Sequence, residues 1–182
     1  IACANYIKKD IVVKKMIEIG SFQGESTSLF AMYLTPDELY AIDPHANGYD
    51  SNDSLSFSNF DDVIHNFKVR TAPFPCVKYI RNFSVDAAKQ FEDDSFDFVY
   101  IDGDHTYEGV LKDVKAYLPK IRVGGYIGGH DLGRKEITDV MIECFDDVDV
   151  HFEDSSWLIK ITPEHKRSFA ENDLPGERKR KS

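Results

Sequence analysis

The sequence lacks the features that mark several classes of protein. In its 182 residues no apolar run approaches the roughly 20 residues of a membrane-spanning helix, so we expect no membrane span. Its three cysteines, Cys3, Cys76 and Cys144, are widely spaced without a Cys-x-x-Cys pair, which predicts reduced thiols in a cytoplasmic protein. Acidic residues outnumber basic ones, 32 to 22, and give a formal net charge of −10. This charge argues against a broad nucleic-acid-binding face.

One basic run stands out, from Arg178 to Lys181. We interpret it as a solvated terminus, with a substrate tether as the alternative. The chain is long enough for one domain with a full hydrophobic core. The sequence therefore predicts a single domain over residues 1–165 and a polar, basic and flexible tail over residues 166–182.

What the chain does have is an alternation of short β-type runs with helical patterns. We expect strands at residues 15–20, 39–43, 77–80, 96–101 and 125–128. We expect helices at residues 25–34, 60–66, 84–91, 107–118 and 134–145. Residues 148–152 and 157–161 then predict a closing antiparallel hairpin. This order is typical of an α/β fold: a Rossmann-like, doubly wound, mostly parallel seven-stranded sheet that ends in an antiparallel hairpin.

A turn with two glycines follows the first predicted strand, at residues 18–24. Gly20 and Gly24 let the backbone turn tightly at the sheet edge where ligands bind. Phe22 stands where a dinucleotide fingerprint needs a glycine, and Glu25 stands where the third glycine is expected. Glu18 adds negative charge just before the turn. Because carboxylates there repel phosphates, the turn favours a cationic ligand such as S-adenosylmethionine over a nicotinamide dinucleotide.

Three further residues extend this candidate cofactor site. Asp43 ends the second predicted strand at the spacing of an acid that accepts hydrogen bonds from ribose hydroxyls, the alternative being a loop aspartate. Ser84 and Asp86 open the short helix after the third strand, where an adenine would rest. For these two residues N-capping is the competing interpretation.

Acids and histidines gather after the fourth and fifth predicted strands, in the runs 102–105 and 130–131. Because neighbouring parallel strands end at the same edge, we expect these side chains to meet beside the glycine turn. Asp102 and Asp131 suit Mg²⁺, Ca²⁺ or Mn²⁺ as ligands. His105 is the expected base for an acceptor hydroxyl, and His130 is a further ligand, a second base or an orienting neighbour.

At these residues the chain resembles class I S-adenosylmethionine-dependent methyltransferases, and most closely methyltransferase family 24. The resemblance rests on residues 96–107 continuing to Asp113, and on residues 124–131. With the glycine turn and Asp43 it covers about residues 16–131. It implies that Asp43 holds the ribose. It also implies that the methionine portion is lined by Gly20, Ser21, Phe22 and Gly24.

The resemblance also implies a metal site. Related sugar O-methyltransferases hold Mg²⁺ with an acid after the fourth strand and with an acid pair, or an acid and an amide, after the fifth. Those positions are Asp102, His130 and Asp131 in this chain. His130 departs from the pattern, since these relatives usually carry a carboxylate there. A histidine three residues beyond the first acid is the base of some antibiotic-sugar enzymes, which points to His105. Residues 47–58 are the candidate lid.

We therefore expect a cytoplasmic methyltransferase that acts on a hydroxyl of a sugar or another small metabolite, with Mg²⁺ assistance left open. One alternative is a metal-independent O- or N-methyltransferase with His105 or His130 as base. Others are a non-catalytic S-adenosylmethionine-binding module and a nicotinamide-dependent oxidoreductase, which Phe22 and Glu25 disfavour. The acceptor and a homo-oligomeric state are left open.

Overall fold

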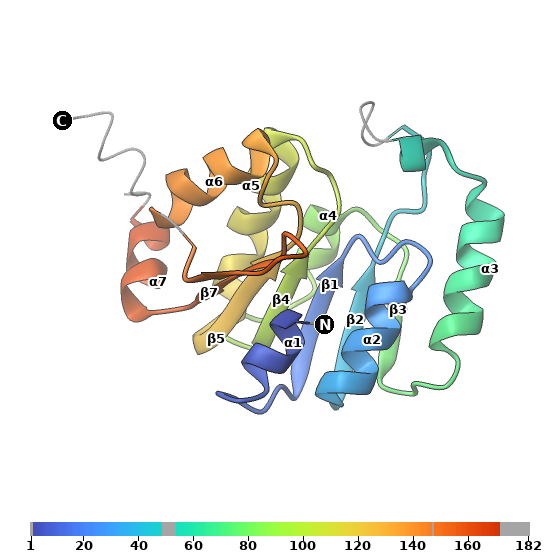
Figure 1. Ribbon diagram of the computed structural model, residues 1–182, viewed down its shortest axis with the longest axis horizontal. Coiled ribbons are helices and arrows are strands. Elements are labelled where there is room, and N and C mark those ends of the chain that lie inside the picture. Colours follow the sequence, from blue (N-terminus) through green and yellow to red (C-terminus); the bar gives the residue numbers. More distant parts are fainter. Residues whose placement is uncertain (1, 49–53, 147, 172–182) are drawn as a thin grey trace.

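The computed structural model describes residues 2–48, 54–146 and 148–171, and its centre is a seven-stranded sheet with helices on both faces (Figure 1). The strands are β1 (Lys15–Ile19), β2 (Glu38–Ile42), β3 (Val77–Ile80), β4 (Phe96–Ile101), β5 (Ile121–Gly129), β6 (Val150–His151) and β7 (Trp157–Lys160). The α-helices are α1 (Ala2–Ile7), α2 (Glu25–Leu34), α3 (Phe60–Thr71), α4 (Ser84–Ala88), α5 (Tyr107–Tyr117), α6 (Lys135–Phe145) and α7 (Pro163–Ala170). Two short 3₁₀ turns, η1 (Ser54–Phe57) and η2 (Leu118–Lys120), complete the described elements.

The strand order is β3-β2-β1-β4-β5-β7-β6, and the first five strands are parallel. β7 pairs antiparallel with both β5 and β6, so the closing hairpin is confirmed. The predicted fold class is confirmed with it. Because the parallel strands all end at one edge, the loops after β1, β2, β4 and β5 meet there.

Each face of the sheet packs against its own helices, because successive strand side chains point to opposite faces. Ile17 and Ile19 face a core built with α4, α5 and α6, which includes Cys144 at 1% exposure. Met16 faces a second core built with α1, α2 and Phe67 of α3. The continuous apolar run of β4 supplies side chains to both cores, which is typical of a central parallel strand.

Two short helices at the ends of the described chain were not predicted. α1 has six residues, too few for a periodic pattern. α7 follows Thr162, whose hydroxyl accepts a hydrogen bond from the backbone N–H of His165, and it has Pro163 in its first turn. The predicted domain boundary after residue 165 thus lies inside α7. Lys166, from the predicted tail, donates hydrogen bonds to the carbonyls of Leu118 and Pro119.

Parts of two predictions lie outside the described residues. They are residues 49–53 of the candidate lid and residues 172–182 of the predicted tail. Within the described part of the lid segment, Ser54–Phe57 form η1. No helix among the described residues combines the length and the apolar character that crossing a membrane requires.

Candidate active site

The glycine turn after β1 adopts left-handed backbone at three residues, with φ of 83° at Gly20, 39° at Phe22 and 78° at Gly24. A Cβ at Gly20 would lie 2.0 Å from the backbone oxygen of Asp102, so only glycine fits against the end of β4. A Cβ at Gly24 would instead lie 3.0 Å from the ring of Phe67. Gly20 thus serves the close approach of β1 to β4, and Gly24 serves the packing of the turn on α3.

The turn, residues 18–24, includes two buried polar atoms without a hydrogen-bond partner among the described residues, Oε1 of Glu18 and Oγ of Ser21. Glu18 is fully buried under α2, where Thr27 donates a hydrogen bond to its other oxygen. Burial raises the pKa of Glu18 to about 7, so it carries only part of its charge at neutral pH. The expected attraction of a cation by Glu18 is therefore weaker than the sequence suggested.

Two neighbouring cavities follow the turn, of about 190 and 230 Å³, and both are lined by Gly20, Asp43 and Gly103. The smaller one is also lined by Ser21, Phe22 and Asp102. The larger one extends between β1, β2, α4 and α5. Its further walls are Ile19, Ile42, Pro44, Phe83, Ser84, Val85, Asp104, Gly109, Lys112 and Asp113. Together they form a crevice along the strand ends.

Ser84 lies in the larger cavity, but as the first residue of α4 rather than as its cap. The N-cap is Phe83, which makes no side-chain capping hydrogen bond, so the capping interpretation of Ser84 is wrong. Its hydroxyl instead donates a hydrogen bond to Asp113 of α5. Asp86 points to solvent and pairs with Lys89 at 2.6 Å.

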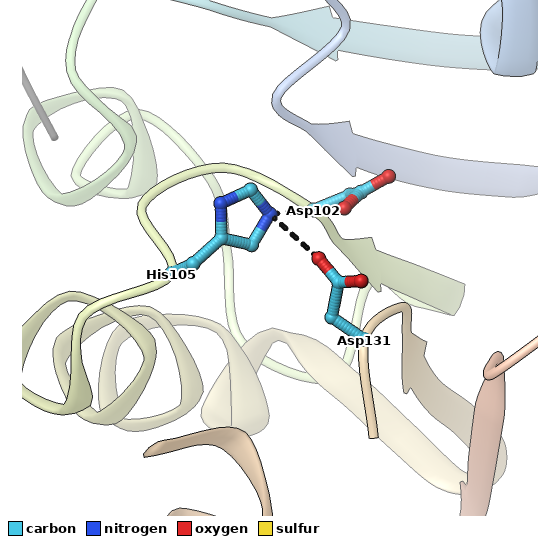
Figure 2. Close-up of side chains that lie close together, drawn as sticks. All are labelled: Asp102, His105 and Asp131. Atoms are coloured by element: carbon cyan, nitrogen blue, oxygen red, sulfur yellow. Dashed lines mark hydrogen bonds and ion pairs between the residues drawn. The ribbon is translucent and has the colours of Figure 1, made fainter. Parts of the chain in front are cut away.

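The predicted meeting of acids and histidines at the edge of the sheet is found for three residues. Asp102 follows β4, His105 lies in the loop before α5, and Asp131 follows β5 with a left-handed φ of 60°. Figure 2 shows the imidazole of His105 facing the carboxylate of Asp131, with Asp102 beside it. His105 Nε2 lies 3.2 Å from Asp131 Oδ2 and 3.4 Å from Asp102 Oδ1.

These three residues each offer a ligand atom, and the three atoms lie within 4.8 Å of one another. The hydrogen bond to Asp102 and the charges of both acids raise the pKa of His105 against the effect of its burial. The site therefore attracts positive charge. An imidazole nitrogen and two carboxylates are also a donor set that divalent cations accept.

His130 takes a different place from the one predicted for a metal ligand. Its Nδ1 lies 3.3 Å from Asp131 Oδ1, outside the group of three, and 36% of its side chain is exposed. With Asp102 it lines a further cavity of about 340 Å³ between α1, α2 and the β6–β7 turn. The floor of this cavity includes Phe30 and Tyr100. Trp157 is 1% exposed and donates a hydrogen bond to the His130 carbonyl, so it packs in the core behind this loop.

The sequence interpretation missed one buried polar residue at this edge, His45. It lies two residues beyond Asp43, and its backbone N–H donates to Asp43 Oδ1 at 2.7 Å. Its ring Nε2 lies 2.8 Å from the carbonyl oxygen of Phe22. The signal that would have found it is its position directly after a strand-end acid and a proline.

The model of a methyltransferase domain family matches residues 17–132, from β1 to just beyond Asp131. The chain belongs to this family. The matched segment contains the glycine turn, Asp43 and the three residues of the acid and histidine group.

Uncharacterized protein R132 of Acanthamoeba polyphaga mimivirus is 31% identical to this methyltransferase domain over 129 residues. The match covers 68% of this chain and 53% of R132, so the domain spans about half the length of this relative. Two of the solved structures that share the fold of this chain are the O-methyltransferase NovP and a phosphoethanolamine N-methyltransferase. The O-methyltransferase NovP has a TM-score of 0.67 and 18% identity, over 88% of this chain and 77% of NovP.

The second solved structure is phosphoethanolamine N-methyltransferase 1 of Haemonchus contortus, in complex with phosphoethanolamine and S-adenosylhomocysteine. It has a TM-score of 0.51 and 16% identity, over 70% of this chain and 24% of that one. The class I methyltransferase architecture predicted from the sequence is confirmed.

Replacement of Gly20 by alanine is expected to lower the free energy of unfolding by about 2–3 kcal/mol, because the methyl group meets backbone at 2.0 Å and the left-handed φ adds strain. Urea unfolding followed by circular dichroism measures the loss. Gly133→Ala is the matched control, since nothing lies within 4 Å of its Cβ position. Equal stability of the two variants would contradict the close approach of β1 to β4.

Replacement of Asp113 by asparagine is expected to flatten the pH dependence of stability. Burial raises the pKa of Asp113 to about 7 from an ordinary value of 3.8. The stabilisation that this protonation gives is therefore fully present below pH 3.8, decreases as the pH rises from 3.8 to about 7, and is absent above that. Between about pH 5 and pH 8 the wild type should lose about 2–3 kcal/mol relative to the variant.

Urea titrations at several pH values measure this difference. The control is Glu92→Gln, which removes an exposed carboxylate. It should keep the pH dependence of the wild type. Parallel curves for the wild type and the Asp113 variant would show that Asp113 is ionised in the folded protein.

Proposed function

We propose that this domain transfers the methyl group of S-adenosylmethionine to a hydroxyl of a small acceptor, a sugar or another small metabolite. The observation that carries the proposal is the meeting of Asp102, His105 and Asp131 directly beside the glycine turn, with Asp102 lining both the crevice and the cavity next to it. The fold shared with the O-methyltransferase NovP supports a transfer to oxygen.

The residues of the crevice fit S-adenosylmethionine. Ser21 Oγ is buried without a partner among the described residues and lines the smaller cavity, so a polar group such as the methionine end would satisfy it. Asp43 lines both cavities and offers carboxylate oxygens to ribose hydroxyls. The larger cavity has apolar walls from Ile19, Ile42 and Val85, which suit an adenine ring.

The group of two acids and a histidine fits Mg²⁺ or Mn²⁺. Two carboxylates whose field raises the pKa of His105 would also attract a divalent cation in place of the proton. We assign Asp102, Asp131 and His105 as the residues that would hold it. His105 thus takes the ligand position that the sequence suggested for His130.

When bound, S-adenosylmethionine supplies the electrophilic methyl group, and the cation supplies positive charge beside the acceptor oxygen. The chain's own residues do the rest. His130 lines the 340 Å³ cavity together with Asp102, so an acceptor hydroxyl bound in that cavity would lie within its reach. Asp131 lies against Nδ1 of His130 and orients the ring, so that Nε2 takes the hydroxyl proton.

A second candidate is a metal-independent transfer with His105 as the base. It is favoured by the two carboxylates at 3.2 and 3.4 Å from Nε2, which would stabilise the imidazolium formed when His105 accepts a proton. In this version Asp102 and Asp131 only orient the ring. Transfer to nitrogen remains compatible with either arrangement.

The test is methyl transfer itself, with and without a cation. The full chain is incubated with S-adenosylmethionine carrying a labelled methyl group and with separate pools of sugars, phenols and amines. Label in a hydroxyl compound, abolished by EDTA and restored by Mg²⁺, is the expected result. Transfer insensitive to EDTA would favour the metal-independent version. Binding of S-adenosylhomocysteine without transfer to any pool would favour the non-catalytic module.

A further inference from the structure

His45 is a fully enclosed polar residue in the loop after β2, with 1% of its surface exposed and a left-handed φ of 41°. Both nitrogens of its ring are engaged. Nδ1 lies 2.5 Å from the hydroxyl of Tyr79 on β3, and Nε2 lies 2.8 Å from the carbonyl oxygen of Phe22 in the glycine turn. The ring therefore bridges two segments that are far apart in the sequence.

The hydrogen-bond partners show what each nitrogen of this ring can donate or accept. The Phe22 carbonyl can only accept, so Nε2 of His45 carries a proton and donates it. Burial raises the pKa of Tyr79 to about 12, so its hydroxyl keeps a proton to donate to Nδ1. Both ring nitrogens thus have a polar partner, and this explains how a histidine is accommodated at a fully buried position.

The backbone N–H of His45 also forms a hydrogen bond with Asp43, the acid that follows β2. The N–H of His45 donates to Asp43 Oδ1 at 2.7 Å, and the N–H of Phe22 donates to Asp43 Oδ2 at 2.8 Å. With the bond from the His45 ring to the Phe22 carbonyl, three hydrogen bonds form a closed loop through His45, Asp43 and Phe22. Phe22 and His45 both hold left-handed backbone, which is unfavourable for residues other than glycine unless such contacts compensate it.

This loop of hydrogen bonds lies at the junction of the two cavities. Asp43 lines both, and Phe22 lines the smaller one, whereas His45 lines neither. Arg81 adds a hydrogen bond of 3.1 Å to the His45 carbonyl, which secures the loop from the β3 side. His45 thus sits behind the two residues that would contact a ligand and fixes their positions relative to each other.

We propose that His45 is the positioning residue of the cofactor crevice: its ring holds the glycine turn against Asp43, so that the turn and the carboxylate are set for the ligand before it binds. The inference rests on the proposed function for the identity of that ligand, S-adenosylmethionine. Preorganisation of this kind raises affinity because binding no longer has to order the turn.

Three variants of the full chain test the proposal. His45→Ala removes both ring bonds, His45→Gln keeps a side-chain amide that can donate to the Phe22 carbonyl, and Phe60→Leu changes only a ring that packs on His45 at 6.0 Å. Calorimetry with S-adenosylhomocysteine measures affinity. Hydrogen–deuterium exchange of the segment 20–24 in the ligand-free protein measures the order of the turn.

We expect His45→Ala to raise Kd at least about tenfold and to speed exchange of the turn by a similar factor. His45→Gln should restore both to within about threefold, and Phe60→Leu should lower Tm with Kd and exchange unchanged. Wild-type affinity and exchange in His45→Ala, or a glutamine variant as impaired as the alanine one, would overturn the inference. If the wild type itself fails to bind, the proposed function fails, while the exchange comparison still decides the role of His45.

Discussion

An Asp102→Asn variant is expected to fold like the wild type and to lose about 10³-fold in kcat/KM for methyl transfer. Asp102 lines the crevice, the 340 Å³ cavity beside it and a small cavity under His105, so its carboxylate faces the point where donor and acceptor would meet. Asparagine keeps the shape and removes the charge. Loss of a charge that helps to hold a cation at the reacting oxygen corresponds to several kcal/mol.

The measurement uses the acceptor found in the labelled-methyl screen, with rates taken at saturating Mg²⁺. Stability should change little, because the backbone N–H of Asp102 keeps its hydrogen bond to Ile19 and its side chain is 29% exposed. Asp93→Asn is the matched control: it makes the same chemical change in the loop that precedes β4, at an exposed ion pair with Lys120. If Asp93→Asn lost as much kcat/KM as Asp102→Asn, the loss could not be assigned to the charge of Asp102.

Much of the fold was readable from the sequence because several signals agreed. Short apolar runs gave the strands of the parallel sheet, and the glycines after β1 gave the turn, since left-handed backbone and close approach both require that residue. The start of α7 was also readable. Thr162 followed by Pro163 is a standard helix start, and it was overlooked because the segment after it resembles a polar tail.

The sequence predicted at which edge of the sheet the site lies, but it did not predict which histidine ring faces the two acids. Strand ends place Asp102 and Asp131 side by side, but which histidine faces them depends on the left-handed backbone at Asp131 and on the path of the loop at His105, which no pattern reveals. Glu18 shows the same limit. It lies on the face of β1 that α2 covers, so it is buried under the turn rather than displayed to a ligand.

The two histidines are expected to separate cation binding from proton transfer. His105→Ala should lose binding of Mn²⁺, used as a probe for Mg²⁺, because it removes one of three ligand atoms within 4.8 Å. His130→Ala should bind Mn²⁺ like the wild type and lose about 10²–10⁴-fold in kcat, the usual effect of removing a general base. Electron paramagnetic resonance measures free Mn²⁺, and the methyl-transfer assay measures kcat.

His65→Ala, which removes an exposed histidine on α3, is the control for both measurements and should change neither. The opposite pattern, with cation binding lost in His130→Ala and kept in His105→Ala, would return the ligand role to His130 and the base to His105, as the resemblance to sugar O-methyltransferases implied. Mn²⁺ binding by neither the wild type nor any variant would leave the metal-independent version, in which His105→Ala must then show the larger loss of kcat. The comparison is decisive because the two rings touch opposite oxygens of one carboxylate, that of Asp131.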